Sequence, residues 1–219
     1  MTDAPGSARP DEPVTEPGLP STARVEAFSD GVLAIAITLL ILEVKVPEVD
    51  APGGLAHALA DTWPSYVTYL VTFGVIGIMW VNHHALFERI KVVNRSLMFL
   101  NLLLLMTISF LPFPTALLAR YLRVGGQDAS IAAAVYSLNA LCIALAFSAM
   151  WRYLSRTPAV LADGFTTDMA RTALKRAAIG PVIYASTIVI AFINPYLCLA
   201  CHAGVALFFV LPGRHTGGR

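Results

Sequence analysis

Apolar residues occur in long runs along this 219-residue chain, and short polar segments separate the runs. The first run extends from Val25 to Leu42, and its only ionisable residues, Glu26 and Asp30, fall in its first two turns. About 20 predominantly apolar residues are needed for an α-helix to cross a bilayer. The pattern therefore predicts a membrane-spanning first helix with a polar layer near its start.

Five further apolar runs follow, and turns rich in Pro, Gly, Lys or Arg separate them. Within the second of these five, Pro112 and Pro114 remove backbone N–H donors, so a kink or break of the helix is expected there. The pattern predicts an all-α integral membrane protein with six transmembrane helices. The five runs are Trp63 to His83, Leu97 to Leu118, Ser130 to Trp151, Leu174 to Ile193 and Tyr196 to Leu211.

Composition agrees with a membrane protein. The chain is 57% hydrophobic and 13% charged, whereas soluble domains are roughly 45–50% apolar and about 25% charged. A formal net charge of +1 without a clustered basic face argues against nucleic acid as a partner. Residues 1–23, rich in Pro and acids, are expected to form a disordered cytoplasmic tail and not a signal peptide. A six-helix transmembrane domain would then cover 24–212, and 213–219 would form a short cytoplasmic tail.

The distribution of basic residues predicts the orientation of the helices. Twelve of the fifteen Lys and Arg residues fall on the side that holds both termini, and three fall on the other side. Cytoplasmic loops carry an excess of Lys and Arg. We therefore expect a multi-pass protein of the cell inner membrane or plasma membrane, with both termini cytoplasmic.

Polar residues of three predicted helices fall at a similar depth near the cytoplasmic boundary: Ser29, Asp30, His83, His84 and Asn101. A carboxylate in hydrocarbon costs roughly 3 kcal/mol on insertion scales, so Asp30 requires protein or water around it. One interpretation is a network that fixes the rotation of the first helix. The alternatives are interhelical hydrogen bonds for assembly alone, at about 0.6 kcal/mol each, and a proton relay.

Above this layer, the first helix carries an apolar stripe. At 100° per residue, Gly31, Ile35, Thr38, Leu39 and Leu42 fall within about a third of the helix circumference. Such a stripe is more often a packing surface than the lining of a pore. The spacing alone leaves both possibilities open.

Metal, cofactor and catalytic motifs give little support for other functions. Adjacent His83 and His84 do not converge on one ion, so no metal site is expected. Cys198-x-x-Cys201-His202 matches the pattern for covalent haem attachment, but it lies within an apolar run, which favours packing in a helix over a cofactor. The chain lacks the common hydrolase, zincin and P-loop motifs and the T-V-G-Y-G filter. We therefore expect no enzyme and no bound cofactor.

Three groups of residues together resemble the transmembrane protein 175 family of lysosomal and bacterial potassium channels. The resemblance covers about Arg24 to Leu118. The groups are Arg24-x-x-x-Phe28-Ser29-Asp30 with Ala34-Ile35-Ala36-Ile37-Thr38-Leu39-Leu40-x-Leu42-Glu43; Trp80-x-Asn82-His83-His84-x-x-Phe87; and Asn101 with Pro112-Phe113-Pro114-Thr115.

The resemblance implies a six-helix subunit that forms a homotetramer in the lipid membrane, with the first helix lining a central pore for monovalent cations. It implies that Ile35, Leu39 and Leu42 form an apolar constriction, that Thr38 faces the pore, and that K⁺ is the permeant ion. The residues that it implies hold the helix are Arg24, Phe28, Ser29 and Asp30, with Trp80, His83, His84 and Asn101 as partners. The alternative function is a proton-coupled secondary transporter that uses Asp30 with His83 or His84, and a third is a scaffold without transport.

Overall fold

The computed structural model describes residues 20–47 and 54–210, with side chains to residue 207. Most of the predicted tails, 1–19 and 213–219, therefore lie outside the described residues, and the first helix begins at Thr22. The elements are α1 (Thr22–Leu39), η1 (Leu40–Glu43), α2 (Gly54–Asp61), α3 (Trp63–Phe87), α4 (Arg95–Ser109), α5 (Pro112–Tyr121), α6 (Gly126–Leu154), η2 (Pro158–Val160), α7 (Thr167–Ala177), α8 (Ile179–Ile193) and α9 (Pro195–Val210).

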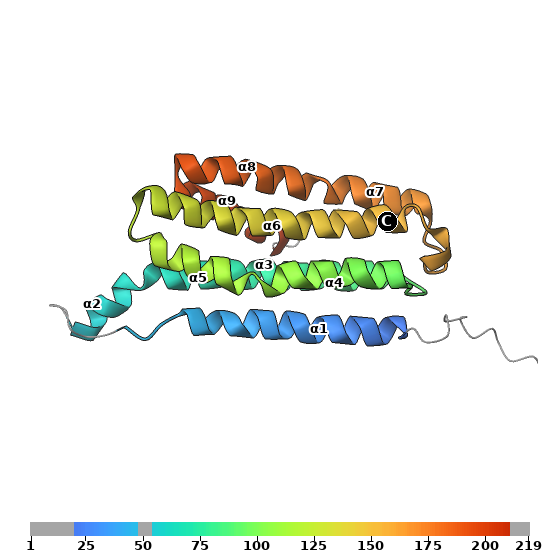
Figure 1. The fold of residues 1–219 in the computed structure, drawn as a ribbon, viewed down its shortest axis with the longest axis horizontal. Helices are drawn as coiled ribbons and strands as arrows, with labels where there is room; N and C mark the ends of the chain where they lie inside the picture. Colours follow the sequence, from blue (N-terminus) through green and yellow to red (C-terminus); the bar gives the residue numbers. More distant parts are fainter. Residues whose placement is uncertain (1–19, 48–53, 211–219) are drawn as a thin grey trace, which may run out of the picture.

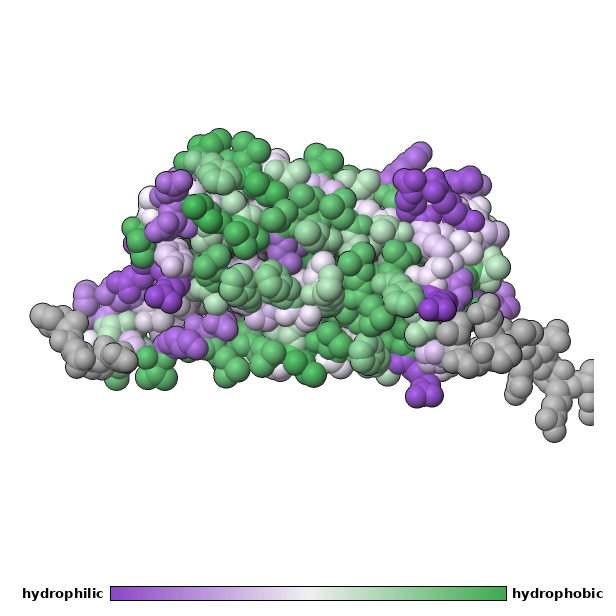
Figure 2. Space-filling model, in the orientation of Figure 1, coloured by the Kyte–Doolittle hydropathy of each residue, from purple (hydrophilic) through white to green (hydrophobic). Residues whose placement is uncertain are grey.

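The helices run side by side along the long axis of the molecule (Figure 1). Within the described part of the chain, five helical segments are long and apolar enough to cross a membrane: Thr22–Glu43, Trp63–Phe87, Arg95–Tyr121, Gly126–Leu154 and Thr167–Ile193. An apolar band lies between two polar ends of the surface (Figure 2). The protein is thus an all-α multi-pass membrane protein. The sixth crossing corresponds to the shorter apolar helix α9 and stays a prediction.

The expected break at the proline pair is confirmed. Helix α4 ends at Ser109, and α5 begins at Pro112. The N–H groups of the first turn of a helix have no partner within the helix, so the N–H that Pro112 lacks costs no hydrogen bond there. The amide of Thr115 already bonds to the carbonyl of Leu111, so the helical path resumes at once. One membrane crossing is therefore built from two helices.

Two helices were not expected from the apolar runs. The fifth span begins seven residues before the predicted Leu174, because α7 starts at Thr167 with the Thr166 side chain accepting from the amide of Met169. Helix α7 is amphipathic and carries Lys and Arg, so an apolar-run criterion passes over it. Helix α2 is only eight residues long, and an Asp61–Arg123 ion pair at 3.0 Å joins it to the turn that follows α5.

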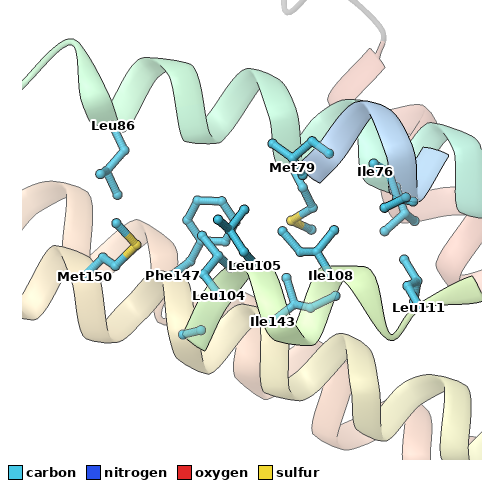
Figure 3. Close-up of a cluster of buried hydrophobic side chains, with 14 of the residues drawn as sticks. Ile76, Met79, Leu86, Leu104, Leu105, Ile108, Leu111, Ile143, Phe147 and Met150 are labelled. Carbon is cyan, nitrogen blue, oxygen red and sulfur yellow. The ribbon is translucent and has the colours of Figure 1, made fainter. Parts of the chain in front are cut away.

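The core lies where α3, α4 and α6 meet, and its side chains interdigitate in Figure 3. Three long helices with apolar faces can bury side chains on more than one flank, so these helices form the centre of the bundle. The labelled core residues are Ile76, Met79 and Leu86 of α3, Leu104, Leu105 and Ile108 of α4, Leu111 before α5, and Ile143, Phe147 and Met150 of α6.

Helix α1 lies at one edge of the bundle (Figure 1) and packs against α3 and α4. Its buried residues recur at helical spacing: Val25, Ser29, Leu33, Ala36 and, in η1, Leu40. Burial is therefore confined to one side of α1. The opposite side of the helix has no partner within the described part of the chain.

Candidate pore helix and its polar layer

A buried chain of hydrogen bonds joins three helices near the start of α1. The Asn101 amide nitrogen of α4 donates to Ser29 Oγ of α1 at 2.8 Å, and Asn101 Oδ1 lies 2.9 Å from His83 Nε2 of α3. The exposed fractions of Ser29, His83 and Asn101 are 0%, 0% and 2%. In an apolar interior such groups remain only when they are paired.

The directions of these bonds fix the proton on His83. Ser29 donates its own hydroxyl proton to the carbonyl of Val25 at 2.8 Å, so its oxygen must accept from Asn101. The amide oxygen of Asn101 then faces His83, and Nε2 must carry the hydrogen. Among the described residues, the buried Nδ1 atom of His83 has no hydrogen-bond partner, and the ring stacks on Phe87 with 4.4 Å between centroids.

Two further pairs join α1 to α3. The Trp80 indole N–H donates to Asp30 Oδ1 at 3.0 Å, and His84 Nδ1 lies 2.8 Å from Glu26 Oε1. His84 is more than half exposed, and its Nε2 lies 3.7 Å from a carboxylate oxygen of Glu88. Both pairs lie on the same flank of α1 as the buried hydrogen-bond chain, so together they fix its rotation.

The structure thus brings most of the predicted polar residues together and defines which of them are bonded to each other. Trp80 was among the expected partners of the first helix, and it bonds to Asp30. The histidines, which were expected at the same depth as Asp30, bond to Asn101 and Glu26. Glu26 was not among the predicted site residues. Its position four residues before Asp30 places it on the same face, and this was the available signal.

Two predicted motif residues lie outside this layer. Arg24 is exposed and makes no side-chain hydrogen bond or ion pair with the residues that the structure describes. The Phe28 side chain is 57% exposed. A role for either residue in holding the helix stays a prediction.

The predicted stripe lies on the open side of α1. The exposed fractions of Ile35, Leu39 and Leu42 are 60%, 43% and 59%. Thr38 is also exposed, and its hydroxyl donates to the carbonyls of Ala34 at 2.8 Å and Ile35 at 3.0 Å. The Thr38 oxygen therefore still presents lone pairs to the outside. One face of α1 is held by polar bonds, and the other is exposed in the single chain.

The haem-like sequence forms packing contacts. Cys198 is buried, with Sγ 3.2 Å from Ser137 Oγ of α6 and 3.4 Å from the carbonyl oxygen of Thr187 on α8. His202 Nε2 lies 3.0 Å from the same Ser137 oxygen. The His202 ring lies between Tyr136, edge-on at 4.9 Å, and Tyr184, stacked at 5.4 Å. These contacts attach α9 to α6 and α8.

The fold and this layer define a helical multi-pass membrane protein whose first helix is anchored on one side and open on the other. The chain belongs to the TMEM175 family. Residues 24–112 match the family model described as endosomal/lysosomal potassium channel TMEM175, as the motif resemblance predicted.

Relatives match over most of the chain. A potassium channel of Streptomyces collinus is 52% identical over 86% of this chain and 91% of its own length. A potassium channel of Chamaesiphon minutus is 39% identical over 90% of this chain and 98% of its own length. The crystal structure of a lysosomal potassium-selective channel TMEM175 homolog from Chamaesiphon minutus superposes with a TM-score of 0.78 and 39% identity, covering 87% of this chain and 96% of that one.

Proposed function

We propose that this chain is the subunit of a potassium-permeable cation channel in which α1 lines the pore. The observation that carries the proposal is the two-sided character of α1. Polar bonds to α3 and α4 fix one face, and an apolar face with one hydroxyl is left exposed. Membership of a potassium channel family and relatives named as potassium channels support K⁺ as the permeant ion.

The constriction is assigned to Ile35, Leu39 and Leu42. Rings of apolar side chains control permeation by excluding water or, when slightly wider, by admitting partly dehydrated ions. K⁺ loses its water more easily than Na⁺, so an apolar ring favours K⁺ modestly. The Thr38 oxygens would offer the permeating ion its nearest polar ligands, since their protons are already donated within the helix.

The assembly that fits an α1-lined pore is a homotetramer with cyclic symmetry. A single copy of α1 presents only a strip of apolar surface, and several copies around an axis are needed to enclose a path. The exposed side of α1 supports this arrangement because nothing within the described part of one chain covers it. The remaining outer surface would contact membrane lipid.

The proposed location is the cell inner membrane or plasma membrane, with both termini cytoplasmic. Nine of the fifteen Lys and Arg residues lie at the start of α1, around the α3–α4 turn, and from the end of α6 through α7. Figure 1 places these segments toward one end of the bundle. An excess of basic residues is typical of cytoplasmic loops.

The alternative, a proton-coupled transporter, has weaker support from the geometry. It needs Asp30 and a histidine as one titrating site, but Asp30 bonds to Trp80, and His83 bonds to Asn101. The nearest carboxylate to His84 belongs to Glu26. A channel is therefore the better explanation of the layer.

Flux from liposomes containing the purified protein tests the proposal. A channel is expected to release K⁺ down an imposed voltage without saturation and without proton counterflow. Mass measurement of the intact oligomer should give four subunits. Saturable K⁺ transport with stoichiometric proton movement would favour the transporter, and no cation leak would favour the scaffold.

A further inference from the structure

A large groove lies on the side of α3 that faces away from α1. It is enclosed by α3, α6, α7, α8 and α9 and has a volume of about 1220 Å³. Small-molecule pockets typically measure roughly 300–1000 Å³, so the groove would hold a larger ligand. Its walls are mainly apolar and include Ile78, Phe147, Ile183 and Val205.

The groove and the polar layer use opposite faces of α3. Trp80 and His84 bond to α1, and His83 bonds to Asn101 of α4. By contrast, Ile78, Asn82 and Arg89 line the groove. At 100° per residue these two sets lie about half a turn apart on the helix. In an assembly built around α1, the groove is therefore directed away from the axis and toward the surrounding lipid.

One end of the groove is basic. Arg89 and Arg176 line it, and neither forms an ion pair with any residue that the structure describes. The Arg89 guanidinium lies over the Phe165 ring, 5.4 Å from its centroid. The acidic residue at this end, Asp168, already accepts a hydrogen bond from Arg171 at 2.7 Å. The uncompensated charge of this end is therefore positive.

A long apolar trough that ends at two unpaired guanidinium groups suits a ligand with an anionic head and apolar chains. We propose that the groove binds an anionic phospholipid. Arg89 and Arg176 would bind the phosphate, because guanidinium groups match the geometry of phosphate oxygens. An acyl chain would lie against Ile78, Phe147 and Ile183, and Asn82 would offer a polar contact between the two regions.

Charge argues against the nearest alternative occupant. Residues of α9 line the groove, so the segment that follows α9 begins close to it. Residues 211–219 contain two Arg, one His and no acidic residue. That segment has the same sign of charge as Arg89 and Arg176, so repulsion disfavours its entry.

The test is native mass spectrometry of the purified, delipidated oligomer titrated with phosphatidylglycerol or phosphatidylcholine. Phosphatidylglycerol should bind more tightly. Each of Arg89→Gln and Arg176→Gln should weaken its binding about fivefold, and both together roughly 25-fold, from the usual contribution of one basic residue to an anionic membrane lipid. Arg152→Gln removes a charge at the same end outside the groove and should leave binding unchanged.

A second variant tests the apolar part separately. A Cβ atom at Gly204 would have no neighbour within 4 Å, and Gly204 lines the groove, so the side chain of Gly204→Leu should extend into the trough. It should weaken the binding of both lipids to a similar extent. The arginine variants should weaken the binding of phosphatidylglycerol more than that of phosphatidylcholine, whose choline cation offsets the charge of its phosphate.

Several results would overturn the proposal. Equal binding of the two lipids would contradict it, and so would unchanged phosphatidylglycerol binding in the double arginine variant. A loss of subunits from the oligomer in that variant would instead make the groove a contact between subunits. Tighter lipid binding by a chain that ends at residue 210 would assign the groove to the C-terminal segment. No ion flux enters these measurements, so they can fail independently of the proposed channel.

Discussion

The indole N–H of Trp80 donates a hydrogen bond to the Asp30 carboxylate at 3.0 Å, and this bond joins α3 to α1 where the first helix enters the apolar part of the chain. An acidic group in this position is thereby paired with a neutral donor and not with a base. Asp30 is partly exposed, so the pair combines a hydrogen bond with access to water. The bond orients α1 and does not require a proton to move.

Removal of the Asp30 carboxylate should therefore impair assembly and current. Asp30→Ala leaves the Trp80 N–H unpaired, whereas Asp30→Asn keeps an acceptor oxygen and should retain most of the current. Interhelical hydrogen bonds in membranes contribute about 0.6 kcal/mol on average and up to about 1.7. Oligomer mass and K⁺ flux measure the outcome. A fully active Asp30→Ala tetramer would show that the bond is dispensable.

Asn101 should be the most sensitive residue of the buried chain. Asn101→Leu leaves Ser29 Oγ and His83 Nε2 without their partner, and a buried unpaired polar group costs about 1–3 kcal/mol. Thermal unfolding in detergent should shift to lower temperature. Asn82→Leu makes the same change at an exposed position and should shift unfolding much less. Equal shifts would mean that the buried bonds add no stability.

A polar side chain in the proposed constriction should change permeation. Ile35→Asn would hydrate an apolar ring, so K⁺ current should increase and discrimination against Na⁺ should decrease. Reversal potentials in mixed K⁺ and Na⁺ solutions measure both effects. An unchanged current and selectivity would remove Ile35 from the pore.

A pair of cysteine variants separates a pore-lining face from a lipid-facing one. Ile35 and Val189 are exposed to similar extents in one chain, 60% and 63%, but α1 and α8 lie on opposite sides of the bundle (Figure 1). A water-soluble thiol reagent should block the current of the Ile35→Cys channel. It should inhibit the current of the Val189→Cys channel no more than that of the chain without a substitution. Block of both variants or of neither would contradict an α1-lined pore.

The packing of the His202 ring should contribute more to the stability of the protein than its hydrogen bond does. His202→Phe keeps an aromatic ring between Tyr136 and Tyr184, and Ser137 retains Cys198 as a partner, so a loss of about 1 kcal/mol is expected. His202→Ala opens a cavity and should cost about 3 kcal/mol. Thermal unfolding of the two variants gives the order. Equal losses in the two variants would make the Ser137 bond, which both variants lack, the main contribution.

Much of the fold follows from the length of the apolar runs. Because a bilayer requires about 20 apolar residues in each crossing, the run from Val25 to Leu42 and the run that begins at Trp63 appear as α1 and α3. The proline pair at 112 and 114 located the break between α4 and α5, since proline lacks the N–H that a helix interior needs. Helix α7 was not predicted because its Lys and Arg residues break up the run of apolar residues, although the helix itself continues through them.

The sequence by itself determined the class of protein, the family and the polar residues that must find partners near the start of α1. It did so because hydrocarbon tolerates neither unpaired backbone nor unpaired side-chain polar groups, which leaves few arrangements. Only the tertiary structure decided that Asp30 pairs with Trp80, that Glu26 pairs with His84, and that the far side of α3 lines a groove. Depth in the membrane can be counted along a sequence, but the rotation and separation of two helices depend on how all their side chains pack together.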